Sequence, residues 1–174
     1  MVTGAASKIA FIGGGNMSQA ILGGLLATGQ SSADCLVVDP DEMVRAKLAA
    51  SGIVTFAAFD ERLLAADRIV LAVKPQMMKQ ALTPFAGKLT TQLVISIAAG
   101  ISVDAIAHWL AVTNVDGGSK FRRIVRTMPN TPALIHAGIT GLYAPPKNVS
   151  SANRRAFSGE KPISTAAVSK ASIK

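Results

Sequence analysis

Three consecutive glycines, Gly13 to Gly15, constrain the fold of this chain more than any other feature. The residues just before them, Ile9–Ile12, are rich enough in branched and aromatic side chains to form a buried strand. From Asn16 onward the apolar side chains recur at the spacing of a helix, at Met17, Ala20, Ile21 and Leu25. The pattern therefore predicts a strand, a glycine turn and a helix in direct succession.

A glycine turn in this position is typical of a dinucleotide-binding unit. Gly13 would permit the tight turn. Gly15 would let the backbone approach a pyrophosphate, which would face the free N–H groups and the positive dipole end of the helix. Ser18 occupies the third small position, where glycine or alanine is usual, and its hydroxymethyl group is expected to fit against the strand. Because a glycine triplet alone also makes an ordinary turn, the prediction rests on the flanking periodicity. The predicted cofactor-binding residues of this unit are Ile12, Gly13, Gly14, Gly15, Asn16 and Met17.

An acidic residue closes the second predicted strand, Cys35–Val38. Asp39 stands where an NAD-binding fold would hydrogen-bond the adenosine ribose, which makes it a further candidate for cofactor binding. The segment Asp39-Pro40-Asp41 is equally typical of a turn followed by a helix N-cap. Both the ribose contact and the plain turn therefore stay open as interpretations of Asp39. Arg45, one turn into the next helix, could instead meet a 2′-phosphate. The residues therefore leave both NADPH and NADH as candidate cofactors.

The rest of the chain alternates short apolar runs with helical segments. Further strands are predicted at residues 54–57, 68–73, 92–97, 123–128 and 139–143. Helices are predicted at residues 42–50, 60–66, 77–82 and 102–110. This alternation is typical of an α/β protein with a doubly wound parallel sheet of the Rossmann type, in which the carboxyl ends of the strands share one edge.

Small or constrained residues follow several predicted strands, so they are expected to meet the glycine turn in one crevice at that edge. Lys74-Pro75 ends one strand, because proline stops a strand and can start a helix. Ala98–Gly100 ends the next, where small residues would let a flat ligand lie close to the backbone, although helix packing explains them equally well. Met128–Thr131 follows the sixth strand. Lys74 also has a second interpretation as an ordinary solvated lysine.

The net charge of +8 suggests a nucleic-acid partner, but its distribution argues against one. Residues 145–174 contribute five of these charges, so the body of the chain has no evident surface for a polyanion. Beyond about residue 153 the sequence has no apolar periodicity that could build a core, and Phe157 is its only aromatic residue. The sequence therefore predicts a dinucleotide-binding domain at residues 1–150 and an irregular, disordered basic tail at residues 151–174.

Cysteine content and hydropathy indicate the compartment. Cys35 is the only cysteine, so neither a disulfide within the chain nor a cysteine metal cluster can form, and no metal site is predicted. The start of the chain lacks the basic and apolar regions of a secretory signal. The most apolar stretch, residues 93–101, is too short to span a bilayer. These features predict a soluble, cytoplasmic protein without a membrane partner.

Four segments carry a resemblance to a known family. They read Phe-Ile-Gly-Gly-Gly-Asn-Met at 11–17, Ala-Val-Lys-Pro-Gln at 72–76, Ser-Ile-Ala-Ala-Gly at 96–100 and Arg-Thr-Met-Pro-Asn-Thr-Pro at 126–132, followed by Gly138. In order and spacing they resemble the amino-terminal domain of the pyrroline-5-carboxylate reductases, over about residues 8–150. The Met-Pro-Asn-Thr-Pro stretch is the most specific part. The resemblance implies reduction of 1-pyrroline-5-carboxylate to L-proline, the last step of proline biosynthesis, with NADPH or NADH.

The resemblance also implies contacts on the nicotinamide side of the cofactor. The turn at Lys74-Pro75 and the backbone at Ala98–Gly100 look like the family's nicotinamide contacts, and Asn130 and Thr131 would lie near the nicotinamide and its ribose. The cofactor-binding residues predicted in this part are Ala72, Val73, Lys74, Pro75, Ala98, Ala99, Gly100, Asn130 and Thr131. No residue stands out as a proton donor, so the catalytic residues stay unknown.

The last part of the chain departs from the family pattern. Family members continue into a helical domain that forms the homo-oligomer and holds the substrate carboxylate with a Ser-Gly-Ser-Gly-Pro-Ala-Tyr-type and a Gly-Gly-Thr-Thr-type stretch, and neither stretch occurs here. We interpret the basic tail as the result of a truncation or a shifted reading frame, with the dimerising domain missing. The chain is expected to bind cofactor weakly and to reduce the imine poorly or not at all. Asp60, where the family has asparagine, would repel a 2′-phosphate if it lay close.

Two other functions stay open. A β-hydroxyacid dehydrogenase or a deazaflavin-dependent NADP reductase uses the same kind of domain, but both lack the Met-Pro-Asn-Thr-Pro stretch. A dinucleotide-binding remnant without catalytic activity would also fit the shortened chain.

Overall fold

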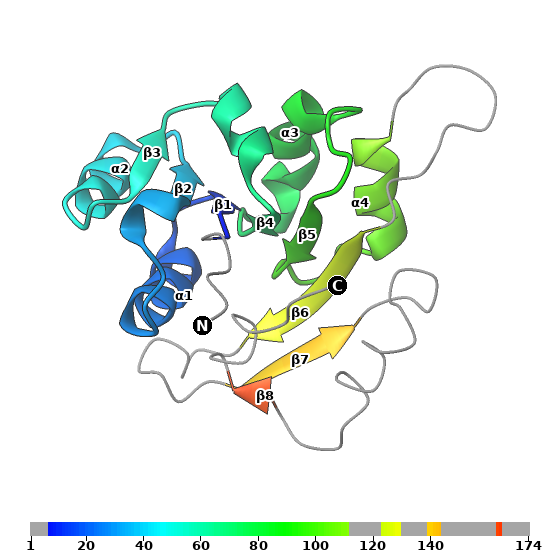
Figure 1. Cartoon of the computed structure of the whole chain (residues 1–174). Coiled ribbons are helices and arrows are strands. Elements are labelled where there is room, and N and C mark those ends of the chain that lie inside the picture. The colour runs from blue at the N-terminus through cyan, green and yellow to red at the C-terminus, as the bar shows by residue number, and fades with distance from the viewer. Residues whose placement is uncertain (1–6, 112–122, 130–138, 144–162, 165–174) are drawn as a thin grey trace.

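The computed structural model describes residues 7–111, 123–129, 139–143 and 163–164, which together form one sheet with helices on both faces (Figure 1). The strands are β1 (Ile9–Ile12), β2 (Cys35–Val38), β3 (Val54–Phe56), β4 (Arg68–Leu71), β5 (Leu93–Ser96), β6 (Ile124–Pro129), β7 (Ile139–Tyr143) and β8 (Ile163–Ser164). Across these described residues the strand order is β3-β2-β1-β4-β5-β6-β7-β8.

The strands from β3 to β6 in this order run parallel, which confirms the predicted doubly wound sheet. Their register pairs Ile12 with Val38 on one side and with Leu71 on the other, and it pairs Leu71 with Ser96. Strands β2, β1, β4 and β5 therefore end level with one another at one edge. From β1 the chain adds strands first towards β3 and then, after a crossover, from β4 towards β6, so the strand order reverses between β1 and β4.

The sheet ends in two antiparallel strands, which the sequence analysis did not predict. The strand expected at 139–143 is present as β7, but it pairs antiparallel with β6. Only residues 130–138 connect the two strands, and a parallel crossover needs about a dozen residues or more. The two residues of β8 pair antiparallel with β7. They fall within the segment predicted as an irregular tail, whose other residues lie outside the described part of the chain.

The helices cover both faces of the sheet. In Figure 1, α1 and α2 lie at the left of the view, and α3 and α4 lie to the right. Their bounds are α1 (Asn16–Ala27), α2 (Glu42–Ala49), α3 (Met78–Leu82) and α4 (Val103–Leu110), with short 3-10 helices η1 (Ser32–Asp34), η2 (Glu61–Ala65), η3 (Pro75–Met77) and η4 (Thr83–Phe85). The short helix expected at 60–66 is present as the 3-10 helix η2. The Asp60 carboxylate accepts from the Arg62 backbone N–H, and the connection closes in the tighter turn common in short links.

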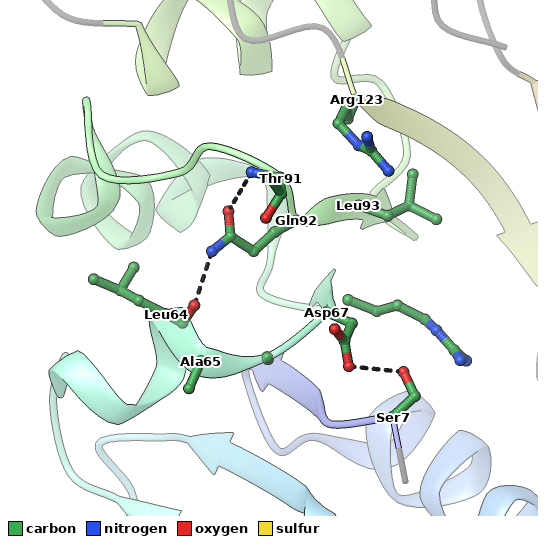
Figure 2. Close-up of a pocket in the computed structure, with 10 residues that line it drawn as sticks. Ser7, Leu64, Ala65, Asp67, Thr91, Gln92, Leu93 and Arg123 are labelled. Carbon is green, nitrogen blue, oxygen red and sulfur yellow. Dashed lines mark hydrogen bonds between the residues drawn. The ribbon is translucent and has the colours of Figure 1, made fainter. Parts of the chain in front are cut away.

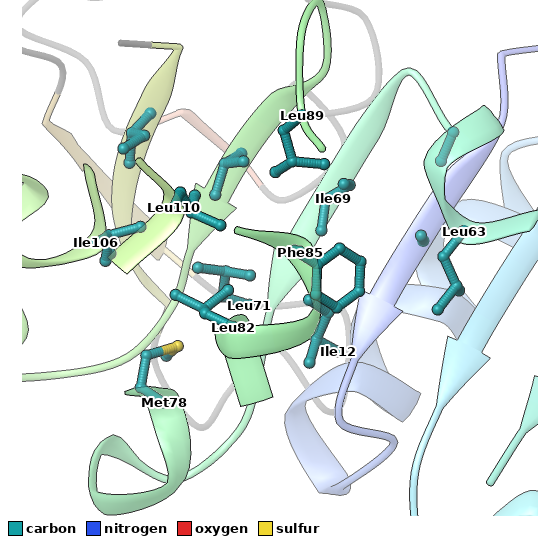
Figure 3. Close-up of a cluster of buried hydrophobic side chains, with 14 of the residues drawn as sticks. Ile12, Leu63, Ile69, Leu71, Met78, Leu82, Phe85, Leu89, Ile106 and Leu110 are labelled. Carbon is teal, nitrogen blue, oxygen red and sulfur yellow. The ribbon is translucent and has the colours of Figure 1, made fainter. Parts of the chain in front are cut away.

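The core has one cluster on each face of the sheet. In β1, Phe11 belongs to the cluster on the α1 side, while its neighbours Ala10 and Ile12 belong to the cluster on the α3 and α4 side. Figure 3 shows the second cluster, in which Leu71, Leu82 and Phe85 are almost completely buried. Helices cover both faces of the sheet, so the side chains on both faces are buried. This burial explains why the parallel strands are continuous apolar runs.

Two further findings concern the described residues only. None of their helices is long and apolar enough to cross a bilayer. They also contain no group of three or more histidine, cysteine or acidic side chains that could hold a metal ion.

Cys35 is fully buried in β2, and this burial, with the Asp34 charge beside it, raises the pKa of its thiol to about 11. The thiol therefore packs as a small neutral side chain at neutral pH.

Candidate dinucleotide-binding site

Gly13 holds the end of β1 against both neighbouring strands, at the point where the strand order reverses. Its backbone N–H donates to the carbonyl of Val38 at 2.9 Å. Its φ is +100°, and a Cβ at this position would lie 2.8 Å from the carbonyl oxygen of Ala72. Both the backbone conformation and the close approach to β4 therefore require glycine, as the tight-turn prediction anticipated.

Gly14 is required for a different reason, which the sequence analysis missed. A Cβ here would lie 2.7 Å from Val44 Cγ1 and 3.0 Å from Leu48 Cδ1, so the missing side chain lets α2 pack against the turn. The Gly14 N–H donates to the Asp39 carboxylate at 2.7 Å. The only signal in the sequence was the second glycine of the triplet, at a position where the dinucleotide fingerprint accepts any residue.

Gly15 is exposed and forms the N-cap of α1 with an extended backbone. A Cβ at Gly15 would have no heavy atom of the described residues within 4 Å, so the space beside this backbone is open in that part of the structure. Within the described part of the chain, no acceptor takes the backbone N–H of Gly15, Asn16 or Met17. Free N–H groups and the positive end of the helix dipole thus face open space, which is the arrangement that binds a pyrophosphate.

Two side chains of α1 hold the glycine turn in place. Ser18 is fully buried, and its hydroxyl donates to the Gly13 carbonyl at 2.6 Å. This hydrogen bond explains how serine fits where the fingerprint usually has glycine or alanine. Gln19 donates from Nε2 to the Gly14 carbonyl at 2.9 Å. The carbonyl groups of Gly13 and Gly14 are therefore tied back to the helix, while the N–H groups at the start of α1 are left without an acceptor among the described residues.

Asp39 supports the turn from the end of β2. One carboxylate oxygen accepts from Gly14, and the other accepts from the backbone N–H of Asp41 at 2.9 Å. The N-cap of α2 is Asp41, whose carboxylate accepts from the Met43 N–H at 2.9 Å. The turn interpretation of Asp39 is thus confirmed, and its proposed contact with the ribose stays a prediction.

Arg45 folds back over the same turn. Its Nη1 donates to the carbonyl of Asp39 at 2.9 Å and to the carbonyl of Pro40 at 2.7 Å. The guanidinium therefore lies at the tip of β2, beside Asp39. The structure thus brings together the two residues that the sequence suggested as contacts for the ribose or for a 2′-phosphate, and those contacts stay predictions.

Asp60 forms a tight ion pair within its own loop. The carboxylate accepts from Arg62 Nε at 2.8 Å and from Nη2 at 2.9 Å. These side-chain hydrogen bonds, followed by the one from the Arg62 backbone N–H, lower the pKa of Asp60 to about 2. The Arg62 guanidinium also lies 4.5 Å from the centre of the Phe56 ring. The charge that was expected to repel a 2′-phosphate is therefore paired with a cation.

The predicted nicotinamide side lies at the carboxyl ends of β4 and β5. The Ala72 N–H donates to the Ile12 carbonyl at 2.8 Å and the Ile97 N–H to the Leu71 carbonyl at 3.1 Å, so the loops after these strands start side by side. The residues predicted to contact the nicotinamide differ in burial. Val73 and Pro75 are half-buried and Ala98 is buried, whereas Lys74, Ala99 and Gly100 are exposed. Asn130 and Thr131 lie outside the described residues.

Arg126 is a feature of the same edge that the sequence analysis did not single out. It pairs with Ser96 in the row of residues that ends β5. Its Nε is buried and has no hydrogen-bond partner among the residues that the structure describes, although buried polar atoms are almost always paired. Its signal in the sequence was its place at the start of residues 126–132, one of the four segments that carry the family resemblance.

The strand order, the reversal between β1 and β4 and the glycine turn before α1 define a Rossmann-type dinucleotide-binding domain. Comparison with known proteins adds the family. The family described as "NADP oxidoreductase coenzyme F420-dependent" matches residues 8–100, and the chain belongs to this family.

Several relatives that match over longer stretches are pyrroline-5-carboxylate reductases, which confirms the resemblance noted in the sequence. The chain is 43% identical to the reductase of Haemophilus influenzae over 150 residues, covering 86% of this chain and 52% of that protein. The solved structure of the Coxiella burnetii reductase matches with a TM-score of 0.72 and 35% identity, covering 87% of this chain and 54% of that chain. The Plasmodium falciparum reductase, solved with NADP bound, matches with a TM-score of 0.65 and 25% identity, covering 86% and 52%. The chain thus spans about half the length of the relatives it matches.

Proposed function

We propose that this chain is the NAD(P)H-binding part of a pyrroline-5-carboxylate reductase, which reduces the cyclic imine of 1-pyrroline-5-carboxylate to L-proline. The observation that carries the proposal is the glycine turn at the strand reversal, with open space at Gly15 and free N–H groups at the start of α1. The names of the relatives support the assignment of 1-pyrroline-5-carboxylate as the substrate. The place of the reaction is proposed to be the cytoplasm.

The residues present fit a dinucleotide. The N–H groups of Gly15, Asn16 and Met17 would hold the pyrophosphate, and the turn at Asp39 would lie beside the adenosine ribose. The backbone at Lys74-Pro75 and at Ala98–Gly100 would support the nicotinamide, since the small residues of the second turn let a flat ring lie close. When bound, NAD(P)H supplies the hydride. The protein itself would hold the nicotinamide at the edge of the sheet and keep it oriented towards the imine carbon.

The substrate side is proposed to need residues beyond those in this chain. The two stretches that hold the substrate carboxylate in the family are absent from its sequence. We therefore expect the isolated chain to bind cofactor and to reduce the imine poorly or not at all, and we expect a homo-oligomer of the family type to depend on the family's helical domain. The decrease in NADPH absorbance on adding the imine measures this, and full turnover by the isolated chain would contradict it.

The cofactor site is tested by one added methyl group. Gly15→Ala places a Cβ in open space, so the fold should be retained, but the methyl group would occupy the position that a pyrophosphate approaches. Isothermal titration calorimetry with NADPH and NADH should show binding by the unsubstituted chain and a dissociation constant at least about tenfold higher for the variant, the loss expected for one charge-assisted hydrogen bond. Titrating both cofactors also reveals which one is preferred.

Gly23→Ala is the matched control. Gly23 lies in α1 and has no heavy atom within 4 Å of an added Cβ, so this variant makes the same chemical change away from the turn. It should bind both cofactors as the unsubstituted chain does. If Gly15→Ala also binds normally, the pyrophosphate does not lie at this turn and the proposal fails.

A coenzyme F420-dependent NADP reductase is the second candidate, because the matching family carries that description. The family match ends at residue 100, whereas the similarity to the Haemophilus influenzae reductase covers 150 residues. The longer similarity favours imine reduction. Reduction of NADP by reduced F420, measured from the absorbance of both cofactors, would reverse this preference.

A further inference from the structure

A second candidate ligand site lies at the opposite edge of the sheet, where the parallel strands begin. A cavity of about 410 Å³ opens there between the starts of β4, β5 and β6 and the residue before β1. Its lining residues are Ser7, Leu64, Ala65, Ala66, Asp67, Arg68, Thr91, Gln92, Leu93 and Arg123. None of them belongs to the predicted cofactor site, and the full length of the strands separates the two places.

Two arginines enter this cavity from the same face of the sheet. Ile69 and Ile124 both face the cluster on the α3 and α4 side, so the residues before them, Arg68 and Arg123, start on the other face. Leu93 pairs with Arg68, and its position in β5 places it between the two arginines. Neighbouring strands lie about 4.8 Å apart, so the two arginine backbones are separated by about 10 Å and both long side chains can reach one ligand over Leu93.

The guanidinium groups of Arg68 and Arg123 have no partner within the described residues. The ion pair found among the described residues joins Asp60 and Arg62, which do not line this cavity. Among the residues that the structure describes, no hydrogen bond involves either guanidinium. Asp67 is the one carboxylate among the described lining residues, and its Oδ2 already accepts from Ser7 Oγ at 2.9 Å and from the Lys8 N–H at 3.0 Å. Two unpaired cations therefore face one carboxylate that is already hydrogen-bonded.

The wall of the cavity is held in a fixed shape by Gln92, which is only 7% exposed. Its Nε2 donates to the Leu64 carbonyl at 2.8 Å, and its Oε1 accepts from the backbone N–H groups of Thr90 at 2.8 Å and Thr91 at 3.1 Å. Figure 2 shows the hydrogen bonds of Gln92 with Leu64 and Thr91 on one side of the cavity, with Arg123 on the β6 side and Asp67 and Ser7 on the side of β4 and β1. A fixed wall beside two guanidinium groups that have no partner among the described residues is suited to bind a small ligand.

We propose that this cavity binds a small oxyanion group, a phosphate or a carboxylate, held between the guanidinium groups of Arg68 and Arg123. Guanidinium groups bind such groups through two parallel hydrogen bonds, which fits two arginines converging on one ligand. The site is independent of the proposed reductase function, because it shares no residue with the cofactor site.

The test is calorimetric titration of the whole chain with inorganic phosphate and, separately, with succinate, at constant ionic strength set with sodium chloride. Saturating NADPH is added in a parallel titration, because the start of α1 can also attract phosphate. We expect saturable binding of phosphate, succinate or both that NADPH does not displace. Arg123→Gln and Arg68→Gln should each raise the dissociation constant about tenfold or more, as loss of a charge-assisted hydrogen bond would.

Lys47→Gln is the matched control, since it removes one exposed positive charge in α2, away from the cavity, and should change nothing. Arg68 is half-buried, so Arg68→Lys is included in case the glutamine variant does not fold, and it should bind more weakly than the unsubstituted chain. The proposal is overturned if neither anion binds, if NADPH displaces all the binding, if both arginine variants bind normally, or if Lys47→Gln weakens binding as much as they do. The reductase proposal is judged on the Gly15→Ala titration alone, so the two can fail separately.

Discussion

At the scale of single residues, Gly13 and Gly14 are neighbours in the chain, yet different contacts require a glycine at each. Gly13 combines a φ of +100° with a close approach to the backbone of Ala72. Gly14 makes room for Val44 and Leu48 of α2. The first contact sets the path of the turn, and the second sets how closely a helix packs beside it. The two positions should therefore respond differently to the same substitution.

Gly13→Ala is expected to lower the free energy of unfolding by about 2–4 kcal/mol, because an L side chain is strained at this φ and its Cβ would press on a backbone carbonyl. Gly23→Ala is the control: its Cβ meets open space within α1, so it should raise the free energy of unfolding by about 0.5–1 kcal/mol. Urea denaturation followed by circular dichroism measures both. Equal stability of the two variants would show that the turn at Gly13 tolerates a side chain.

The ion pair of Asp60 and Arg62 predicts a pH dependence. Hydrogen bonds from Arg62 lower the pKa of Asp60 to about 2, from an ordinary value of 3.8. Because the folded state has the lower pKa, the pair stabilises the fold fully above about pH 4, and this contribution is lost as the pH falls towards 2. The carboxyl carbon resonance of Asp60, followed by NMR, should titrate with a midpoint near 2.

Arg62→Gln should move this midpoint back towards 3.8. The change in overall stability should be small, because the pair is exposed to solvent and exposed ion pairs contribute little. A midpoint near the ordinary value in the unsubstituted chain would mean that the ion pair does not persist in solution.

The glycine turn was predictable from sequence because its signal is local. A buried apolar run, three glycines and a helical period are all read within a few residues of Gly13. The role of Gly14 was not predictable, since its partner Val44 lies in the next helix and the contact depends on how α2 crosses the turn. Likewise, Asp39 was recognised as a ribose or turn residue, but its hydrogen bond to Gly14 requires the register of β1 with β2.

At the scale of elements, the parallel strands were predicted to within one or two residues because each is an apolar run closed by a turn. The direction of β7 was not predicted, since an isolated short strand carries no signal for its partner. The short connection of residues 130–138 is what decides it. The helix at 60–66 was predicted, but its 3-10 form was not, because so short a segment does not reveal its helical period.

The start of α4 gives a prediction at this scale. The Ser102 hydroxyl accepts from the Ala105 N–H at 3.1 Å, which satisfies one of the free donors of the first turn. Ser102→Ala should therefore lower the free energy of unfolding by about 1 kcal/mol. Ser31→Ala is the control, because Ser31 precedes η1 without a side-chain capping hydrogen bond. Thermal unfolding of both variants measures the difference, and similar melting temperatures would exclude a capping role for Ser102.

At the scale of the whole molecule, the sheet carries one candidate site at each edge. The carboxyl ends of its strands present the glycine turn, and the opposite ends present the cavity lined by Arg68 and Arg123. The glycine turn is hydrogen-bonded to β2 through Gly13 and Gly14, and β1 is hydrogen-bonded to the start of the loop after β4 through Ala72. A ligand bound at the turn should therefore stabilise the parallel sheet as a unit, not only the loop that it contacts.

This coupling makes thermal unfolding a readout of cofactor binding. At a concentration of NADPH or NADH one hundred times the dissociation constant, binding to the folded state alone adds about 2.7 kcal/mol of stability. For a chain of this size that corresponds to a rise of about 5–10 °C in melting temperature. Gly15→Ala should show a clearly smaller rise at the same concentration, because its methyl group lies where the pyrophosphate would approach, whereas Gly23→Ala should show the full rise. An unchanged melting temperature for the unsubstituted chain at the highest soluble cofactor concentration would mean that the turn, despite its free N–H groups, does not hold a dinucleotide.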